Sequence, residues 1–456
     1  MEVNFLESHA HPKPDGVLSV VVLFLLGVFL LTLRNSDSLI NPILYTEDGA
    51  WLGLAFTKGW AYAFLNAKEG YFVAGNIILL WTAYTISNFI CDNPLICLPQ
   101  SISIVSISFY STIATMAFAT LSGAVRREFR WMIFFLFLLI PYGDSSNEII
   151  GRISNIGYML VPLALFLLYR NEERKSNIEY ISIAALLTIS AATNPVVIPV
   201  VGLYSLWKII RDGKSFARDN AITLIGITSI TILVLFKMTS TRNSSIIGSI
   251  DYSNLIEVFI ARGILYPFVF PAYNSLTDTL ALILFAGWLL LIFTAILHSN
   301  EQPRKYLLMA LGTLFLYLAF TIIMRQSLTQ QLGDYRHTFP DRYFMGPNSL
   351  AILLTLGSLS SFTNDTSIAR KRIARTPLLA IIALYLYNAP YIFEHNSPRM
   401  RIIDTTTFQD EICRSSAYSN GIKKSIVLVP IYFSGWEIRI PPDMLIDAQA
   451  KMSCSL

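Results

Sequence analysis

Twelve apolar stretches that meet or approach the length of a membrane-spanning helix constrain this chain more than any other feature of its sequence. A helix needs about 20 consecutive apolar residues to cross the hydrocarbon core of a bilayer. The stretches cover residues 16–33, 71–90, 100–122, 131–141, 155–169, 178–193, 195–210, 220–237, 277–297, 306–324, 345–362 and 377–393. The sequence therefore predicts an all-α polytopic membrane protein.

The composition supports this prediction and excludes several classes of soluble protein. Of the 456 residues, 54% are hydrophobic and only 14% are charged. Soluble globular proteins carry roughly 25% charged residues, so this chain has too few charges to cover a surface that faces water. A cytosolic enzyme, a nucleic-acid-binding protein and a disordered scaffold are therefore excluded.

The distribution of Lys and Arg among the short loops predicts the orientation of the chain. The loops richest in these residues lie at 126–130, 170–175, 208–218, 304–305 and 370–375. Cytoplasmic loops of membrane proteins carry an excess of Lys and Arg, so we expect these five loops in the cytoplasm. The loops expected outside are 142–154, 238–276 and 325–344, together with the C-terminal tail.

The stretch 71–90 breaks the expected alternation of sides. Residues 34–70 follow one crossing from a cytoplasmic N-terminus, and residues 91–99 must lie outside because the next span leads to cytoplasmic Arg126. Both segments are external only if 71–90 lies at the outer face without crossing, which leaves about 11 crossings. The rival interpretation makes 49–66 an additional span, and Glu47, Asp48, Lys58 and the glycine-rich start disfavour it.

Two domains are expected. Residues 1–394 form the membrane domain, whose first external loop, 34–99, carries helices at the membrane surface. Residues 395–456 are polar and form a small external cap. Within the cap, the β-branched residues at 425–433 and the alternation at 435–440 predict two strands, so we expect an α+β fold.

The cysteines predict one disulfide and no metal site. Cys413 and Cys454 are the only cysteines of the tail, and on this topology they face an oxidising compartment, so we expect them to pair. The sequence contains no CxxC, CxxH or HExxH motif, which makes a zinc site unexpected. No cofactor is predicted.

A pair of adjacent carboxylates, Glu47 and Asp48, follows the first span. They lie in a segment rich in aromatic residues, including Trp51, and aromatic rings favour the membrane–water interface. Neighbouring residues on a helix point about 100° apart, so one carboxylate can act as a general base while the other stabilises the helix N-terminus. The alternative is that both are ordinary acids of a first helical turn.

The order of these features resembles the GT-C superfamily of polytopic glycosyltransferases, which use polyprenyl-phosphate sugars. The resemblance rests on the acidic pair, the outer-face helix, the turn Gly59-Trp60 and the segment Lys68-Glu69-Gly70-Tyr71 before an apolar helix. It is closest to the bacterial O-antigen-modifying, serotype-conversion glucosyltransferases. The resemblance covers the topology of the whole chain, whereas the motifs cover a short part of it.

The resemblance implies a periplasm-facing active site in the bacterial inner membrane. The implied reaction moves a sugar, glucose, from undecaprenyl phosphate or a similar polyprenyl phosphate to a lipid-linked glycan such as the O-antigen of lipopolysaccharide. Membrane lipids, a flippase and a donor synthase of the same pathway are the implied partners. Asp48 or Glu47 would be catalytic; the glycine after Asp48 would let substrate approach closely and favours Asp48, although the choice stays open. Metal-dependent members carry an Asp-x-Asp pattern that this chain lacks, so no metal is expected.

The lipid phosphate that leaves in this reaction needs positive charge, and the planar fork of Arg matches phosphate oxygens. The candidate phosphate-binding residues are Arg336, His337 and Arg342 in the loop 331–344, together with Lys68 and Arg152. The candidates for stacking on the sugar or the acceptor are Tyr335, Tyr343 and Trp51. The alternatives are that the arginines contact ordinary lipid headgroups and that Arg152 pairs with Glu148.

Two other functions are open, a lipid-linked polysaccharide polymerase and a polytopic transporter or flippase. Transporters bury ionisable residues near the middle of the membrane, whereas the spans of this chain are nearly free of charge. A polymerase would be favoured by a large central external loop, and this chain instead places its acids in the first loop. Both comparisons favour the glycosyltransferase.

Overall fold

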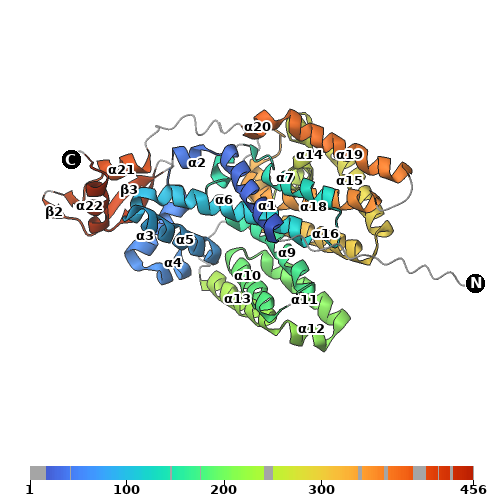
Figure 1. The fold of residues 1–456 in the computed structure, drawn as a ribbon, viewed down its shortest axis with the longest axis horizontal. Helices are drawn as coiled ribbons and strands as arrows, with labels where there is room; N and C mark the ends of the chain where they lie inside the picture. The colour runs from blue at the N-terminus through green and yellow to red at the C-terminus, as the bar shows by residue number, and fades with distance from the viewer. Residues whose placement is uncertain are drawn as a thin grey trace, which may run out of the picture.

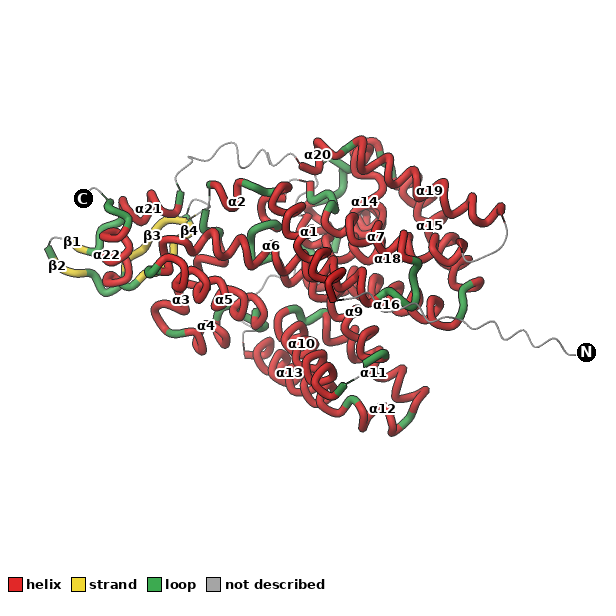
Figure 2. The backbone as a smooth tube through the Cα atoms, in the orientation of Figure 1, coloured by secondary structure: helices red, strands yellow, loops and turns green. Residues whose placement is uncertain are grey.

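The computed structural model describes residues 17–41, 43–143, 146–174, 176–240, 250–336, 341–363, 368–393, 407–419, 421–431 and 435–454. These residues form an elongated and mostly helical molecule. The long helices make up its body, and a small domain with short strands, from the C-terminal part of the chain, lies at one end (Figure 1, Figure 2).

Each of the twelve apolar stretches coincides with a helix. These helices are α1 (Val17–Arg34), α5 (Ala74–Cys91), α6 (Pro94–Thr120), α7 (Arg127–Leu138), α9 (Leu160–Glu172), α10 (Asn177–Thr193), α11 (Val197–Asp212), α13 (Ala221–Ser240), α15 (Asp278–His298), α16 (Glu301–Met324), α18 (Met345–Thr363) and α19 (Ile368–Tyr387). Among the described residues, six helical segments are long and apolar enough to cross a membrane. The chain is therefore an integral membrane protein, while the count of about 11 crossings stays a prediction.

Helix α18 forms the centre of the helical body. Nearly all of its residues are buried, and it packs against α16, α15, α7 and α9. Small residues along membrane helices let neighbouring backbones approach closely. Gly346 at the start of α18 is such a position, because a Cβ there would collide with the Tyr158 carbonyl oxygen and the Tyr317 ring. Tyr317 also donates a hydrogen bond to that carbonyl, at 2.7 Å.

The segment 238–276, expected as an external loop, is helical in its described part, and Tyr252–Ser275 is long and apolar enough to cross a membrane, so its external position stays a prediction. The chain there forms the 3₁₀ helix η3 (Tyr252–Asn254), the π-helix η4 (Ile256–Leu265), α14 (Tyr266–Val269) and the 3₁₀ helix η5 (Phe270–Ser275). Glu257 and Arg262 place two charged residues in this run, but both are buried with partners. Tyr273 donates to Glu257 at 2.6 Å, and Arg262 forms an ion pair with Asp341.

Helices α3 (Thr46–Lys58) and α4 (Trp60–Asn66) follow the first helix, and α5 then forms a hairpin with α6. Helix α5 has the length and apolar composition of a span, so the structure does not confirm that 71–90 stays at the outer face. At the turn of the hairpin, Asn93 contacts the C-terminal domain by donating to Asp447 at 2.7 Å. The position of α5 relative to the membrane therefore stays a prediction.

Labelling of single cysteines tests that prediction. Asp37 and Asn88 are exposed, and no cysteine among the described residues is free. If α5 does not cross, an impermeant thiol reagent added to intact cells should label both Asp37→Cys and Asn88→Cys. The exposed Arg218 lies in a Lys- and Arg-rich loop, so Arg218→Cys should be protected. Labelling at 37 with protection at 88 would show that α5 crosses.

The C-terminal domain pairs two short hairpins with two helices. Its elements are α21 (Phe408–Arg414), β1 (Tyr418–Ser419), β2 (Ile422–Lys423), β3 (Val427–Ile431), β4 (Trp436–Ile440) and α22 (Pro442–Lys451). Strands β3 and β4 are antiparallel, with Val427 opposite Ile440, and they lie where the sequence predicts strands. Strand β4 packs on α3, where a Cβ at Gly53 would come within 2.7 Å of the Arg439 backbone nitrogen. The domain thus supports the helix that carries the acidic pair.

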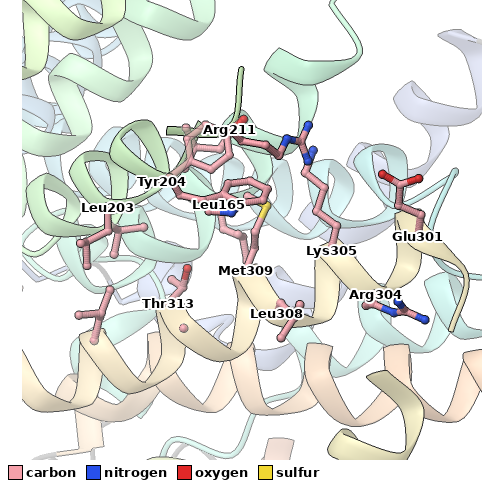
Figure 3. A pocket seen from close by; sticks show the side chains of 15 residues that line it. Leu165, Leu203, Tyr204, Arg211, Glu301, Arg304, Lys305, Leu308, Met309 and Thr313 are labelled. Atoms are coloured by element: carbon pink, nitrogen blue, oxygen red, sulfur yellow. The ribbon is translucent and has the colours of Figure 1, made fainter. Parts of the chain in front are cut away.

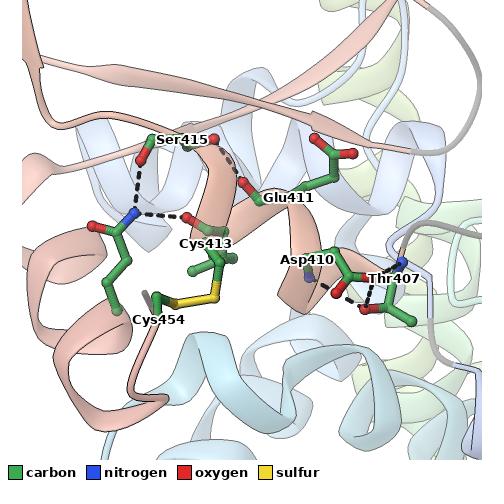
Figure 4. Close-up of a disulfide and its surroundings, with 8 residues drawn as sticks. Thr407, Asp410, Glu411, Cys413, Ser415 and Cys454 are labelled. Atoms are coloured by element: carbon green, nitrogen blue, oxygen red, sulfur yellow. Dashed lines mark hydrogen bonds between the residues drawn. A yellow bond between two sulfur atoms is a disulfide. The ribbon is translucent and has the colours of Figure 1, made fainter. Parts of the chain in front are cut away.

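A disulfide joins Cys413 at the end of α21 to Cys454, the pair expected from the sequence (Figure 4). Gln449 of α22 reinforces this connection by donating to the carbonyl oxygens of Ile412 and Ser415, at 2.7 and 2.6 Å. A second disulfide, Cys91–Cys97, closes the α5–α6 hairpin and was not predicted.

Removing the two disulfides should destabilise the chain to different extents. The Cys413–Cys454 bond closes a separation of 41 residues and the Cys91–Cys97 bond one of only 6. In the chain-entropy account, the longer loop contributes roughly 4 kcal/mol and the shorter about 2 kcal/mol. Thermal unfolding should therefore show a larger loss for Cys413→Ser with Cys454→Ser than for Cys91→Ser with Cys97→Ser. The reverse order would contradict the expected loop dependence.

Candidate functional site

The two adjacent carboxylates begin α3 and point in different directions. Glu47 and Asp48 lie in its first turn, where negative charge interacts favourably with the helix dipole. Glu47 is half-buried and lines a cavity, whereas Asp48 is completely buried. The structure therefore separates the pair into one carboxylate that a ligand can reach and one that supports the protein around it.

The cavity has a volume of about 460 Å³ and lies where several distant segments meet. Helix α3, the start of α5, residues 154–158, the α10–α11 junction, the C-terminal end of α16 and residues 342–343 all contribute to its walls. It contains five of the residues predicted from the sequence, Glu47, Trp51, Lys68, Arg342 and Tyr343. These residues come from three separate segments of the chain, so the fold brings them together.

Two arginines and a tyrosine form the basic part of the cavity. The guanidinium carbons of Arg325 and Arg342 lie 5.1 and 5.3 Å from the centroid of the Tyr343 ring, within the range of cation–π attraction. Arg342 also forms an ion pair with Glu148, at 2.6 Å. Among the described residues, Arg325 has no carboxylate partner. An anionic ligand would therefore find positive charge here that the protein neutralises only in part.

Three asparagine side chains fix the backbone of one polar wall, residues 153–157. Asn76 donates to Ile153 O at 2.6 Å, Asn194 to Gly157 O at 2.8 Å, and Asn155 to Glu148 O at 2.5 Å. Ser154 lies in this wall, and its buried Oγ has no hydrogen-bond partner among the described residues. A buried polar atom without a partner is costly, so Ser154 is a candidate contact for a hydroxyl group of a ligand.

Asp48 supports the same wall from behind. Its Oδ2 accepts a hydrogen bond from the Ile153 backbone N–H, at 3.1 Å. Burial raises the pKa of Asp48 to about 7, and the neighbouring charge of Glu47 adds to this rise, while the N–H groups of Ile153 and Ser154 and the charge of Arg152 oppose it. Asp48 thus joins the first turn of α3 to residues 153–154, and a ligand in the cavity does not reach it.

The remaining predicted residues do not line the cavity. Arg152 is buried, donates to the Ile43 carbonyl oxygen at 3.3 Å and lies 5.5 Å from the Tyr45 ring, so it holds the segment that leads into α3. Tyr335 donates to Asp278 at 2.6 Å, and Arg336 is exposed elsewhere. His337 lies outside the described residues.

Sequence reasoning missed Arg325, Tyr71 and Tyr158, which also line the cavity. Arg325 could have been recognised, because it directly follows the span 306–324 on the side that the orientation rule expects to be poor in Arg. Tyr71 ends the segment Lys68-Glu69-Gly70-Tyr71, which the resemblance includes without giving this tyrosine a role, and Tyr158 carries no signal because aromatic residues are common throughout this chain.

The described residues contain no cluster of three or more His, Cys, Asp or Glu side chains that could hold a metal ion. Comparison of the chain with known family models and with curated proteins finds no match. The assignment of a function therefore depends on the residues of the cavity and their geometry.

Proposed function

We propose that this chain is a glycosyltransferase that moves a sugar from a polyprenyl-phosphate donor to a lipid-linked glycan. One observation carries the proposal. A single cavity in a membrane protein combines a reachable carboxylate, Glu47, with Arg325 and Arg342 and with aromatic side chains. A base, a phosphate-binding group and a surface for a sugar ring are the three components that such a transfer requires.

The reaction assigns a step to each component. Glu47 takes the proton of the acceptor hydroxyl as its oxygen bonds to the anomeric carbon of the sugar. The bond between that carbon and the phosphate oxygen breaks, and the polyprenyl phosphate leaves with the bonding electrons. Arg325 and Arg342 balance the charge that the phosphate gains, because hydrogen bonds from guanidinium to phosphate are short and strong.

Glu47 is preferred over Asp48 as the base because of the difference in access. A general base must come within about 3 Å of the proton that it removes. Glu47 lines the cavity and Thr46 donates to its Oε2 at 2.6 Å, which orients the carboxylate, whereas Asp48 is completely buried. Asp48 is then a positioning residue that holds the cavity wall through Ile153.

The proposal includes finer features that follow from the family resemblance. The protein would belong to the GT-C superfamily, cross the bacterial inner membrane about 11 times and work on the periplasmic side, with the C-terminal domain outside. Glucose is the proposed sugar and an O-antigen glycan the proposed acceptor. A flippase and a donor synthase would supply the lipid-linked sugar.

The direct test measures sugar transfer in membranes that contain the chain. A polyprenyl-phosphate donor with radiolabelled glucose is added together with a lipid-linked glycan, and label on the glycan is measured. Transfer of single sugars that depends on the chain would support the proposal. Joining of whole lipid-linked glycans would instead indicate a polymerase, and movement of the donor across the bilayer without transfer would indicate a flippase.

Arg325 provides a sharper test of the phosphate-binding role. We expect Arg325→Gln to raise the KM for the donor by at least about tenfold, because a hydrogen bond to a charged group contributes roughly 1.5–3 kcal/mol. Arg336→Gln is the matched control, since Arg336 is exposed and does not line the cavity. Equal effects of the two substitutions on the KM would remove Arg325 from the donor site.

A further inference from the structure

A second cavity lies at the opposite end of α16 from the candidate site. Lys305, Leu308 and Gly312 of α16 line this groove, whose volume is about 420 Å³, while Thr321 and the adjoining Arg325 line the candidate site. The 24 residues of α16 extend over about 36 Å at 1.5 Å per residue, which is close to the thickness of a bilayer. The two cavities therefore line opposite halves of α16.

The walls of the groove are apolar and open toward the surroundings of the helical body. They come from α9, α11 and α16, with aliphatic side chains such as Leu165, Leu203 and Leu308 (Figure 3). Leu203 and Leu308 are about half exposed, at 49% and 50%. In a membrane protein, exposed aliphatic residues on the outside of the helical body face lipid chains, so the groove can receive acyl chains from the bilayer.

Positive charge gathers at one end of the groove. Three cations, Arg211, Arg304 and Lys305, line it together with a single carboxylate, Glu301 (Figure 3). The charged groups of Arg211 and Lys305 lie 5.0 and 5.7 Å from the centroid of the Trp207 ring, which holds them near each other.

The protein neutralises these cations only in part. Arg211 forms an ion pair with Asp212, and Lys305 with Glu172. Arg304 instead donates to two backbone carbonyl oxygens, of Ile296 at 3.1 Å and Ser299 at 2.9 Å. A backbone carbonyl carries no net charge, so the positive charge of Arg304 is available to an anionic group at the mouth of the groove.

We propose that this groove binds one anionic phospholipid from the leaflet opposite the candidate site. Its acyl chains would lie along α11 and α16, and its phosphate between Arg211 and Arg304. The cations belong to the Lys- and Arg-rich segments 208–218 and 304–305, which the orientation rule predicts on the cytoplasmic side, where anionic lipids attract basic residues. A zwitterionic headgroup would add its own ammonium beside these cations, so an anionic lipid fits better.

Two glycines provide a matched pair of variants that fill space. A Cβ added at Gly312, in the groove, or at Gly287, on the lipid-facing side of α15, would meet no atom within 4 Å. Gly312→Leu should therefore fill the groove without disturbing the fold, and Gly287→Leu makes the same change outside it.

Two arginines provide a matched pair of charge variants. Arg211 and Arg218 each form an ion pair with the aspartate that follows, but only Arg211 lines the groove. Each Lys or Arg near a membrane surface contributes about 1 kcal/mol to the attraction of anionic lipid. Arg211→Gln should therefore weaken binding about fivefold, while Arg218→Gln should leave it unchanged.

Native mass spectrometry of the purified full chain measures binding as the amount of lipid that stays attached. The chain is titrated with phosphatidylglycerol and, separately, with phosphatidylcholine. We expect one phosphatidylglycerol to be retained by the parent, Gly287→Leu and Arg218→Gln, and to be lost in Gly312→Leu. Equal retention of the two lipids, or undiminished retention by Gly312→Leu, would overturn the proposal. Because the readout is lipid binding, its result does not depend on the proposed transferase activity.

Discussion

Replacing Glu47 by glutamine is expected to lower the rate of sugar transfer by about 10²–10⁴-fold, the usual effect of losing a general base. The amide keeps the shape of the side chain and its place in the cavity, and Thr46 can still donate to its oxygen. It cannot take a proton from the acceptor hydroxyl. The loss should therefore appear in kcat, while the KM for the donor changes little.

Two further substitutions distinguish this role from a structural one. Glu69→Gln removes an exposed carboxylate from the segment that follows α4 and should leave transfer unchanged. Asp48→Asn keeps an oxygen that can accept from Ile153 N–H, so it should retain far more activity than Glu47→Gln. If Glu47→Gln stays within a few-fold of the parent, the acidic pair only stabilises the start of α3. The base must then be sought elsewhere.

Much of the helical body could be predicted from the sequence, because a helix is the favourable conformation for each apolar stretch in a bilayer. A spanning segment must satisfy its own backbone hydrogen bonds, which a helix does, and helices lie where the stretches predict them. The helices of 250–275 could not be predicted in this way, because the charged residues Glu257 and Arg262 interrupt the apolar run. Tyr273, the partner of Glu257, lies later in the same segment, while Asp341, the partner of Arg262, comes from another part of the fold, so the sequence does not reveal that these charges can be buried.

The cavity could be predicted in part because interfacial position and residue type carry information. Glu47 and Arg342 are a carboxylate and a cation in loops predicted to be external, and the structure brings both into one cavity. Tyr335 and Arg336 are of the same residue types as Tyr343 and Arg342 and lie in the same predicted loop, 331–344. Tyr335 nevertheless points elsewhere and donates a hydrogen bond to Asp278. The direction of a loop depends on such tertiary contacts, which neither composition nor spacing encodes.

The choice between Glu47 and Asp48 illustrates the same limit within one helical turn. The helix period shows that the two side chains diverge, but not which of them faces the cavity. That depends on the rotation of α3, which is fixed where β4 packs at Gly53 and where Ile153 donates to Asp48. Both contacts join residues that are distant in the sequence.

The stability of the chain should fall as the pH rises from about 4 to about 7, because of Asp48. Burial raises the pKa of this carboxyl to about 7 in the folded chain, from an ordinary value of 3.8. A group whose pKa is raised by folding stabilises the folded state while it is protonated, and this contribution is lost as the pH passes through the folded pKa. The shift corresponds to a loss of about 4 kcal/mol in the free energy of unfolding.

Asp48→Asn isolates this contribution, since an asparagine stays neutral at every pH while its oxygen can still accept from Ile153 N–H. Thermal unfolding of both chains at pH 4 and pH 8 should show a smaller decrease for Asp48→Asn than for the parent. Glu69→Gln controls for the loss of a carboxyl group at an exposed position. If the parent and Asp48→Asn lose the same stability between these pH values, Asp48 is held ionised in the folded chain. Its negative charge would then act beside Glu47 at neutral pH, and the difference in roles would rest on access to the cavity alone.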